Sequence, residues 1–259
     1  MFFFFAFIAS AQQHKGIVYY GSINAIGTGN AKGPDSNAYL IFNKTQSYYV
    51  TAKDSLEKAE RINEQKTFLK DDDSGGAIYN GMKVSAQGDQ VVYNLKNKII
   101  HSNILYGKQI YVVENAEKIH WKILPDIKKI GKFTVKKAIA NFRGRKYTAW
   151  YTPEITVPYG PWKLNGLPGL ILEAYDEGKF AYWYFKSFEY PTANKENVNN
   201  IRKGKNEKPI DFLSLEEFKK FCKDEVEKSY EKMILIAKQH PGIKPLKGTV
   251  RDYFVEVFE

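Results

Sequence analysis

Short runs of β-forming residues, separated by polar turns, recur through the middle of this chain and constrain its fold more than any other feature. Between Val91 and Phe188 the runs begin roughly every ten residues, which is the spacing of strands in an antiparallel sandwich, barrel or curved sheet. Aromatic residues make up 15% of the chain, and they suit a pleated, half-buried surface. The sequence therefore predicts a mainly β protein of the α+β class, with a curved antiparallel sheet or partial barrel.

The N-terminal third adds one expected strand and a hairpin. Residues 16–26 are rich in β-branched and aromatic side chains, whereas 27–37 are rich in Gly, Asn and Ser and should form a loop. Residues 38–42 and 47–50 flank a short polar turn, which is a hairpin pattern. The other expected strands are 91–93, 99–100, 109–113, 120–123, 136–140, 146–151, 169–175 and 180–188, with a closing strand at 250–258.

One long helix is expected near the C-terminus. Ser214 and Glu217 have the spacing of a capping box, in which each side chain satisfies a free backbone N–H. Apolar residues follow at helical spacing as far as Met233, and the helix should end near Gln239. The apolar stripe predicts one C-terminal helix packed on the sheet, with Cys222 as a buried thiol.

Three polar segments are expected to carry little regular structure. Residues 54–66 are highly charged and suggest a short helix, and 195–209 suggest a flexible loop. The acidic run at 71–76 lacks the alternating ligands and closing Glu of a calcium loop, so a solvated turn is preferred.

The N-terminus has the pattern of a secretory signal. Residues 2–8 are apolar, and Ala9 and Ala11 fit a cleavage site after Ala11. No Lys or Arg follows Met1, so residues 1–11 are interpreted as a signal peptide truncated at its N-terminus, with a buried first strand as the alternative. Residues 12–259 are then expected to form a single domain that is periplasmic or secreted.

Charge and composition exclude several classes. The net charge is +10, but the basic residues are scattered and interleaved with acids, so no nucleic acid is expected as a partner. A single cysteine cannot form an internal disulfide or a metal cluster. No segment after the N-terminal run is long and apolar enough to cross a bilayer, so the protein is not expected to be membrane-spanning.

The most distinctive stretch combines NFRGR at 141–145, TAWYTPE at 148–154, GP at 160–161 and NGLPGLIL at 165–172. In this order the segments closely resemble the GLPGLI family, a group of secreted bacterial proteins. The hexapeptide is intact as Gly166, Leu167, Pro168, Gly169, Leu170 and Ile171. The resemblance covers roughly residues 88–189 and implies no activity, because the family has no settled biochemical function. The family often carries a cysteine where this chain has residues 132–135, so any thiol role there is absent.

The chemistry of the hexapeptide indicates backbone geometry. Gly tolerates positive φ, and Pro fixes φ at about −65° and has no N–H to donate. Pro168 and Gly169 suit the central positions of a type II turn, after which residues 170–172 should enter a buried strand. We predict a tight corner between two strands; the alternative is a rim of a binding groove.

A search for catalytic chemistry finds no recognised motif. His14, His101, His120 and His240 lack metal-ligand spacing, and His120 is expected in a strand. No metal, cofactor or catalytic residue is therefore assigned. Glu154, Glu173 and Asp176 near the hexapeptide leave open an envelope hydrolase or protease.

The preferred hypothesis is an exported, non-enzymatic envelope protein that binds an apolar or extended ligand, such as a lipid or peptide, or an outer-membrane partner. A curved sheet under one helix offers a concave apolar face. The candidate binding residues carry aromatic rings or guanidinium groups and are Trp150, Tyr151, Trp162, Tyr182, Trp183, Arg143 and Arg145.

Simpler readings exist for these residues. Core packing is the alternative for each aromatic residue. A solvated hairpin tip is the preferred reading of Arg143-Gly144-Arg145, against an anion clamp. A protein–protein interaction module that pairs a strand edge or a basic surface with an outer-membrane partner is the other alternative function. No feature of the sequence indicates an oligomeric state.

Overall fold

The computed structural model describes residues 15–27, 33–57, 85–203, 209–240 and 242–258. The strands of the first half are β1 (Gly16–Asn24), β2 (Asp35–Phe42), β3 (Gln46–Thr51), β4 (Asp89–Asn94), β5 (Ile99–Tyr106) and β6 (Lys108–Asn115). Those of the second half are β7 (Lys122–Ile130), β8 (Phe133–Phe142), β9 (Arg145–Thr152), β10 (Leu170–Asp176), β11 (Ala181–Glu189) and β12 (Phe212–Ser214). The helices are α1 (Asp54–Glu57), α3 (Leu215–Gln239) and α4 (Val250–Tyr253).

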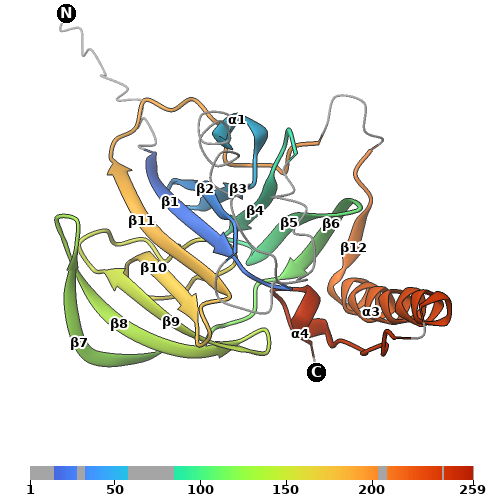
Figure 1. Ribbon diagram of the computed structural model, residues 1–259. Helices are drawn as coiled ribbons and strands as arrows, with labels where there is room; N and C mark the ends of the chain where they lie inside the picture. Colours follow the sequence, from blue (N-terminus) through green and yellow to red (C-terminus); the bar gives the residue numbers. More distant parts are fainter. Residues whose placement is uncertain (1–14, 28–32, 58–84, 204–208, 241, 259) are drawn as a thin grey trace, which may run out of the picture.

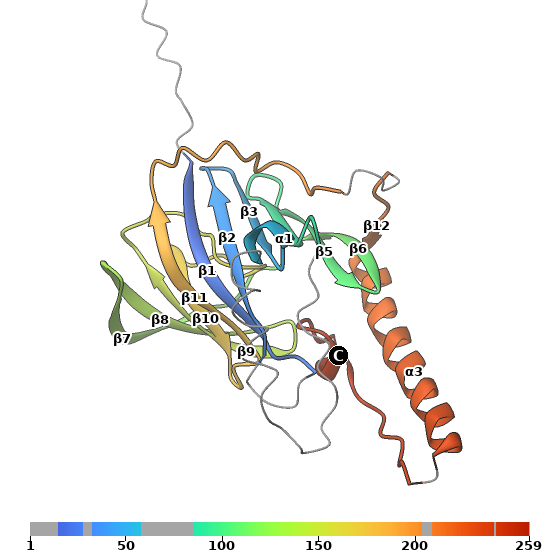
Figure 2. The ribbon, with the colours of Figure 1, turned by 45° about the horizontal axis from the view of Figure 1, so that its top comes forward.

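All of these strands belong to one open sheet with the order β12-β6-β5-β4-β3-β2-β1-β11-β10-β9-β8-β7. The pairs are antiparallel, apart from the parallel pair of β12 with β6. The sheet curls strongly (Figures 1 and 2), so that Glu114 of β6 pairs with Arg143 after β8, although these strands lie near opposite ends of the order. The prediction of a mainly β fold with a curved antiparallel sheet is confirmed, and the sheet is not a closed barrel.

The largest apolar cluster fills the concave side of the sheet. Alternate residues along a strand face the same side, which brings Val18 and Tyr20 of β1 to the cluster together with Leu40 of β2. The connection between β9 and β10 folds into the same space and contributes Tyr159 and Leu167, both about 1% exposed. The concave face is thus largely occupied by the protein's own chain.

The opposite face of the central strands is covered by residues 194–203, which have no helix or strand. Val198 and Ile201 are buried there against β2, β3 and β4. The backbone N–H of Arg202 donates to the Gln90 side-chain oxygen, and the Gln90 amide donates back to the Arg202 carbonyl, both at 2.9 Å. In Figures 1 and 2 this segment crosses one end of the sheet as an orange trace.

The helix α3 begins as predicted. The Ser214 hydroxyl accepts from the Glu217 N–H, and the Glu217 carboxylate accepts from the Ser214 N–H at 2.7 Å. Phe218, Cys222 and Val226 bury one face of its first half, where Phe218 and Cys222 pack with β6. The predicted packing on the sheet is confirmed, and so is the burial of Cys222, but only the first half of the helix takes part.

One predicted strand is wrong, and the strand predicted at 120–123 begins two residues later, at Lys122. Residues 250–258 do not close the sheet, because Thr249 and Asp252 form a capping box that starts the one-turn helix α4. His120 and Trp121 precede β7 and are not strand residues, since the Trp121 indole N–H turns away to donate to the Asn165 carbonyl at 2.8 Å.

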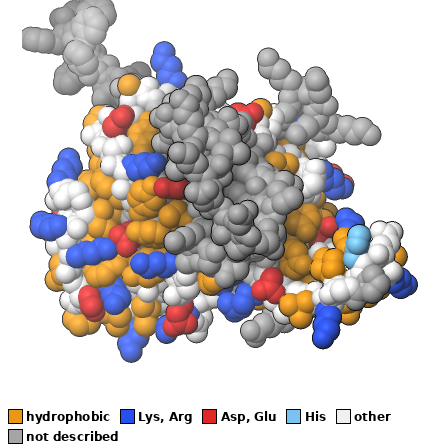
Figure 3. All heavy atoms as spheres, viewed as in Figure 1, with side chains coloured by type: hydrophobic (Ala, Val, Ile, Leu, Met, Phe, Trp, Pro, Cys, Tyr) orange, Lys and Arg blue, Asp and Glu red, His pale blue; other side chains and the backbone are white. Residues whose placement is uncertain are grey.

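The predicted signal peptide (1–11) and acidic turn (71–76) lie outside the described residues, and so does most of the segment at 54–66, of which α1 is the described part. No helix in the described part of the chain is long and apolar enough to cross a bilayer. Lys and Arg side chains are spread over the face shown in Figure 3, between acidic and apolar ones.

Candidate functional site

A cavity of about 350 Å³ lies inside the curl of the sheet, between β1, β3, β4, β5 and β11 on one side and the C-terminal residues 253–256 on the other. The connection between β9 and β10 also reaches it through Trp162 and Lys163. Its lining therefore comes from segments far apart in the sequence, and it combines apolar side chains with indole, carboxyl, amide and ammonium groups.

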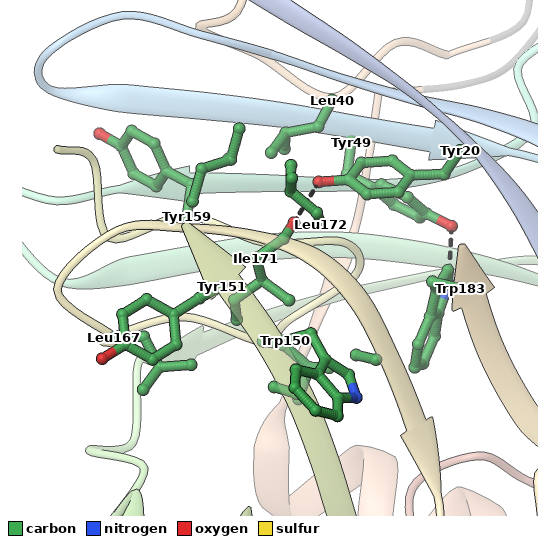
Figure 4. Packing of buried hydrophobic residues seen from close by; sticks show 14 of the residues in the cluster. Tyr20, Leu40, Tyr49, Trp150, Tyr151, Tyr159, Leu167, Ile171, Leu172 and Trp183 are labelled. Atoms are coloured by element: carbon green, nitrogen blue, oxygen red, sulfur yellow. Dashed lines mark hydrogen bonds between the residues drawn. The ribbon is translucent and has the colours of Figure 1, made fainter. Parts of the chain in front are cut away.

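Two stacked indole rings form part of the wall. The rings of Trp162 and Trp183 lie 5.8 Å apart and within 10° of parallel, and Tyr147 lies behind both at 6.2 and 6.3 Å. The Trp183 indole N–H donates to the Tyr49 hydroxyl at 2.9 Å, a bond drawn in Figure 4. Burial raises the pKa of Tyr49 to about 12, so its hydroxyl stays protonated. These contacts hold two parallel, stacked indole rings at the cavity.

Asp89 supplies a carboxyl group to the same cavity. Its Oδ1 accepts from the Leu105 N–H at 2.9 Å. Burial raises the pKa of Asp89 to about 7, which outweighs the lowering effect of that hydrogen bond. The neighbouring Asn103 amide donates to the Gly88 carbonyl at 3.0 Å and to the Gln109 side-chain oxygen at 2.7 Å. A protonated Asp89 could therefore donate a hydrogen bond, and an ionised one could bind a cation.

A buried ionic cluster lies beside the cavity, and two of its members, Lys163 and Glu256, line the cavity wall. The Lys163 Nζ lies 2.5 Å from Glu114 Oε1 and 2.6 Å from Glu256 Oε1. Arg143 also pairs with Glu114, and its Nε lies 3.5 Å from Glu256 Oε2. These four side chains are at most 7% exposed, and their two positive and two negative charges cancel.

The cluster shifts the pKa values of Lys163 and Glu256. Burial would lower the pKa of Lys163, but Glu256 and Glu114 outweigh it and raise that pKa above its usual range. Burial raises the pKa of Glu256 despite the opposing effect of Lys163. Removing one member of such a buried network leaves an uncompensated charge, so the cluster ties β6 and the β9–β10 connection to the C-terminal segment.

Arg145 makes a second buried anchor. Its guanidinium pairs with Asp176 at 3.1 Å and donates to the backbone carbonyls of Val255, Arg251 and Phe254 at 2.8, 2.8 and 3.0 Å. The C-terminal segment is thereby held over the end of β9 and β10, next to the cavity.

The preferred reading of Arg143-Gly144-Arg145 as a solvated hairpin tip is wrong. Arg143 and Arg145 are 9% and 4% exposed, because the C-terminal segment covers the turn and the Val257 N–H donates to the Arg143 carbonyl at 3.0 Å. Both central residues of the hairpin have positive φ, 48° at Arg143 and 65° at Gly144, as a two-residue type I′ turn requires. The anions that the two arginines bind are carboxylates of the same chain.

The structure brings only two of the five predicted aromatic residues to the cavity, Trp162 and Trp183. Tyr182 points to the other face of β11, where its ring lies 5.7 Å from Tyr175. Tyr151 is in the apolar core. Trp150 is buried at another site, with the Lys128 ammonium 4.4 Å from its ring centre.

The three carboxylates near the hexapeptide do not converge. Glu154 is exposed and accepts from the Thr134 N–H at 2.8 Å. Glu173 pairs with Lys128 at 2.8 Å. Asp176 pairs with Arg145, and its position three residues from Glu173 places it on the opposite face of β10. No group of His, Cys, Asp and Glu within the described segments could hold a metal ion.

The hexapeptide forms a corner that leads into β10, but not the predicted type II turn. The Gly169 N–H donates to the Leu167 carbonyl at 2.8 Å, a three-residue turn around Pro168, and the Leu170 N–H donates to Ile155 at 3.0 Å. Gly169 has φ of 155°, and a Cβ there would lie 2.1 Å from the Thr152 carbonyl oxygen.

The residues after this corner are deeply buried. Leu170 and Ile171 are 0% exposed, and the Tyr20 hydroxyl donates to the Ile171 carbonyl at 2.6 Å (Figure 4). The predicted entry into a buried strand is confirmed. None of the hexapeptide residues lines the cavity.

Sequence reasoning missed Asp89, Glu114, Lys163 and Glu256. A signal for two of them was present. Glu114 alternates with Ile110 and Val112, and Glu256 alternates with Phe254 and Phe258, so each acid occupies a position expected to face inward. Asp89 resembles an ordinary polar residue at the start of a strand, and Lys163 lies in a loop without periodicity.

A wider and more open depression of about 1330 Å³ lies outside the Arg145 anchor, and Gly144, Glu177 and Tyr253 are among its lining residues. Charged groups that line it are already paired, as Lys146 with Glu177 at 3.0 Å and Arg145 with Asp176 at 3.1 Å. The smaller and less open cavity is therefore the better candidate site.

Comparisons with known proteins add a partial match. A family model described as "Protein of unknown function (Porph_ging)" matches residues 142–173, which include the Arg143 turn and the hexapeptide. No curated protein matches the chain. Among solved structures, PNGF-II in space group P21 has a TM-score of 0.50 at 16% identity, covering 80% of this chain and 32% of that one.

A second crystal form of PNGF-II, in space group C2, has a TM-score of 0.45 at 17% identity and covers 71% of this chain and 30% of that one. At such low identity the likeness concerns the fold alone. This chain spans only about a third of the PNGF-II chain, as the 32% coverage states. The sequence match to a family of unknown function is consistent with the motif at 141–172.

Proposed function

We propose that this protein is a non-enzymatic binding protein of the bacterial cell envelope, and that its cavity binds a short peptide or another small amphipathic molecule. The observation that carries the proposal is the stacked pair of Trp162 and Trp183 in a cavity that also presents Asp89 and Lys163. Binding pockets typically combine an apolar or aromatic wall with a few polar groups that fix orientation.

The lining favours some ligands over others. A volume of about 350 Å³ is at the low end of ligand pockets. Asp89 and Asn103 would lose hydration against a hydrocarbon chain, which disfavours a lipid tail. A flat ring can stack on the indole wall while amide or hydroxyl groups reach Asp89, so a peptide with an aromatic side chain fits better.

The proposed location rests on residues 2–11, where an apolar run precedes a small-residue cleavage pattern. Detection of the mature N-terminus by Edman or mass-spectrometric sequencing tests this part. A chain that retains residues 2–8 in the cytoplasmic fraction would contradict it.

Ligand binding is tested by purifying the protein without denaturation and identifying retained small molecules by mass spectrometry. Trp162→Leu should lower retention roughly tenfold, because an aromatic stacking partner is lost. Trp150→Leu is the control, since Trp150 is a buried tryptophan that lies away from the cavity, and this variant should retain the ligand. Empty wild-type protein, or equal loss in both variants, would overturn the proposal.

A hydrolase is the second candidate, favoured by one observation. The pKa of Asp89, raised to about 7 by burial, suits a general acid or base at neutral pH. The ligand identified from the wild-type protein is incubated with wild type and with Asp89→Asn. Turnover that disappears in the variant while binding persists would favour the enzyme.

The interaction module receives less support. The edge strand β7 exposes Ile123 and Ile127 at 50% and 60%, but its sequence contains Pro125, which has no N–H to donate to an added strand. Its pairing with β8 is also interrupted between Ile123 and Ile127.

A further inference from the structure

The far end of α3 and the segment that follows it expose an apolar surface. We call residues 232–240 and 242–248 the tip. Its aliphatic side chains Leu235, Ile236, Ile243 and Leu246 are 59%, 42%, 41% and 82% exposed. Figure 2 shows this end of α3 projecting away from the sheet, so the side chains belong to neither of the clusters that cover the sheet.

The charged side chains of the tip are all basic. Lys232, Lys238, Lys244 and Lys247 are all exposed, and the sequence from 232 to 248 contains no Asp or Glu. The first half of α3 differs, because its lysines alternate with acids and form pairs such as Lys219 with Glu216 and Lys220 with Asp224, at 2.7 and 2.6 Å. The basic character is therefore concentrated where the aliphatic side chains are exposed.

The segment after the helix is held beside it. Lys247 pairs with Glu227 at 2.6 Å, and its ammonium lies 5.8 Å from the Tyr230 ring centre. This fold-back keeps Leu246 on the same projecting part of the molecule as Leu235. In Figure 3, apolar and basic side chains lie intermixed over α3, at the lower right.

We infer that the tip binds the surface of an anionic lipid bilayer. Exposed aliphatic side chains next to lysines are the composition of elements that lie in the membrane interface: the apolar groups enter the acyl boundary, and lysines reach the phosphate headgroups with their ammonium ends. A second copy of the chain fits less well, because a symmetric contact through the tip would oppose lysines to lysines.

The test is sedimentation of the full chain with vesicles of phosphatidylglycerol and phosphatidylcholine in equal amounts, and with phosphatidylcholine alone. Binding is expected only to the anionic vesicles and should weaken as salt is added. Lys238→Gln with Lys244→Gln should weaken binding by roughly 25-fold, about fivefold for each lysine. Leu235→Gln with Leu246→Gln should weaken it by roughly tenfold or more.

The matched control is Lys219→Gln with Lys220→Gln, which removes two lysines from the charge-paired half of the same helix and should leave binding nearly unchanged. Circular dichroism establishes that every variant keeps its fold. Absence of binding to anionic vesicles, or equal losses in the control, would overturn the inference. Concentration-dependent dimerisation that Leu235→Gln with Leu246→Gln abolishes, without vesicle binding, would assign the surface to a second copy and also overturn it.

Discussion

Replacing Lys163 by Met should destabilise the protein far more than the loss of an exposed ion pair would. Lys163 is 2% exposed on its side chain and bridges Glu114 and Glu256, which are 0% and 7% exposed. Met removes the positive charge and leaves two buried carboxylates with Arg143 as their remaining buried cation. Breaking such a pair by removing one partner costs about 3–5 kcal/mol, and we expect a loss in this range.

Urea unfolding followed by tryptophan fluorescence measures the free energy of unfolding. The matched control is Lys146→Met, whose pair with Glu177 at 3.0 Å is 53% and 74% exposed, and which should cost about 0–1 kcal/mol. Lys163→Met combined with Glu256→Gln restores a balance of one acid and one base, and it should recover part of the loss.

The effect of pH gives an independent check. Burial raises the pKa of Glu256 already in the wild type, and removal of Lys163 should raise it further. A carboxyl with a raised pKa in the folded state binds more protons folded than unfolded, so stability rises as pH falls through that pKa. The difference in the free energy of unfolding between Lys163→Met and the wild type should therefore become smaller as the pH is lowered. A loss no larger than that of Lys146→Met, with no dependence on pH, would refute the reasoning.

Three further predictions follow from single positions. Gly169→Ala should lower the free energy of unfolding in urea by about 3 kcal/mol, because its Cβ would lie 2.1 Å from the Thr152 carbonyl oxygen at φ of 155°. Gly166→Ala, with φ of 91° and open space around the Cβ, should lower it by about 1–2 kcal/mol. A larger loss for Gly166→Ala than for Gly169→Ala would contradict the geometry. Burial raises the pKa of Asp89 to about 7, so the free energy of unfolding of the wild type should fall as pH rises from about 4 to about 7. Asp89→Asn should remove this dependence on pH, and an unchanged dependence in the variant would contradict the assigned role of Asp89. Burial raises the pKa of the Cys222 thiol to about 12, so iodoacetamide should label it only after unfolding, and rapid labelling of native protein would disprove the burial.

The regular elements could be predicted because local signals sufficed. Alternating apolar residues defined most strands, and the Ser214–Glu217 capping box fixed the start of α3. The loose alternation of residues 250–258 predicts a strand, but the Thr249–Asp252 capping box starts the one-turn helix α4 instead.

The site could be predicted only in part, because its contacts join distant segments. Arg143 was expected in solvent, since its partners Glu114 and Glu256 are 29 residues before it and more than 100 after it in the sequence. Trp162 and Trp183 were proposed for their chemistry, but nothing local to either ring showed that they stack. The curl of the sheet creates both the ionic cluster and the cavity.

The most direct test of the proposed function is a crystal structure of the protein purified under native conditions from cells that produce it. The account predicts electron density for a bound molecule in the cavity of about 350 Å³, lying against the Trp162–Trp183 wall and within hydrogen-bonding distance of Asp89. A cavity that holds only water, or that the protein's own side chains fill, would contradict it.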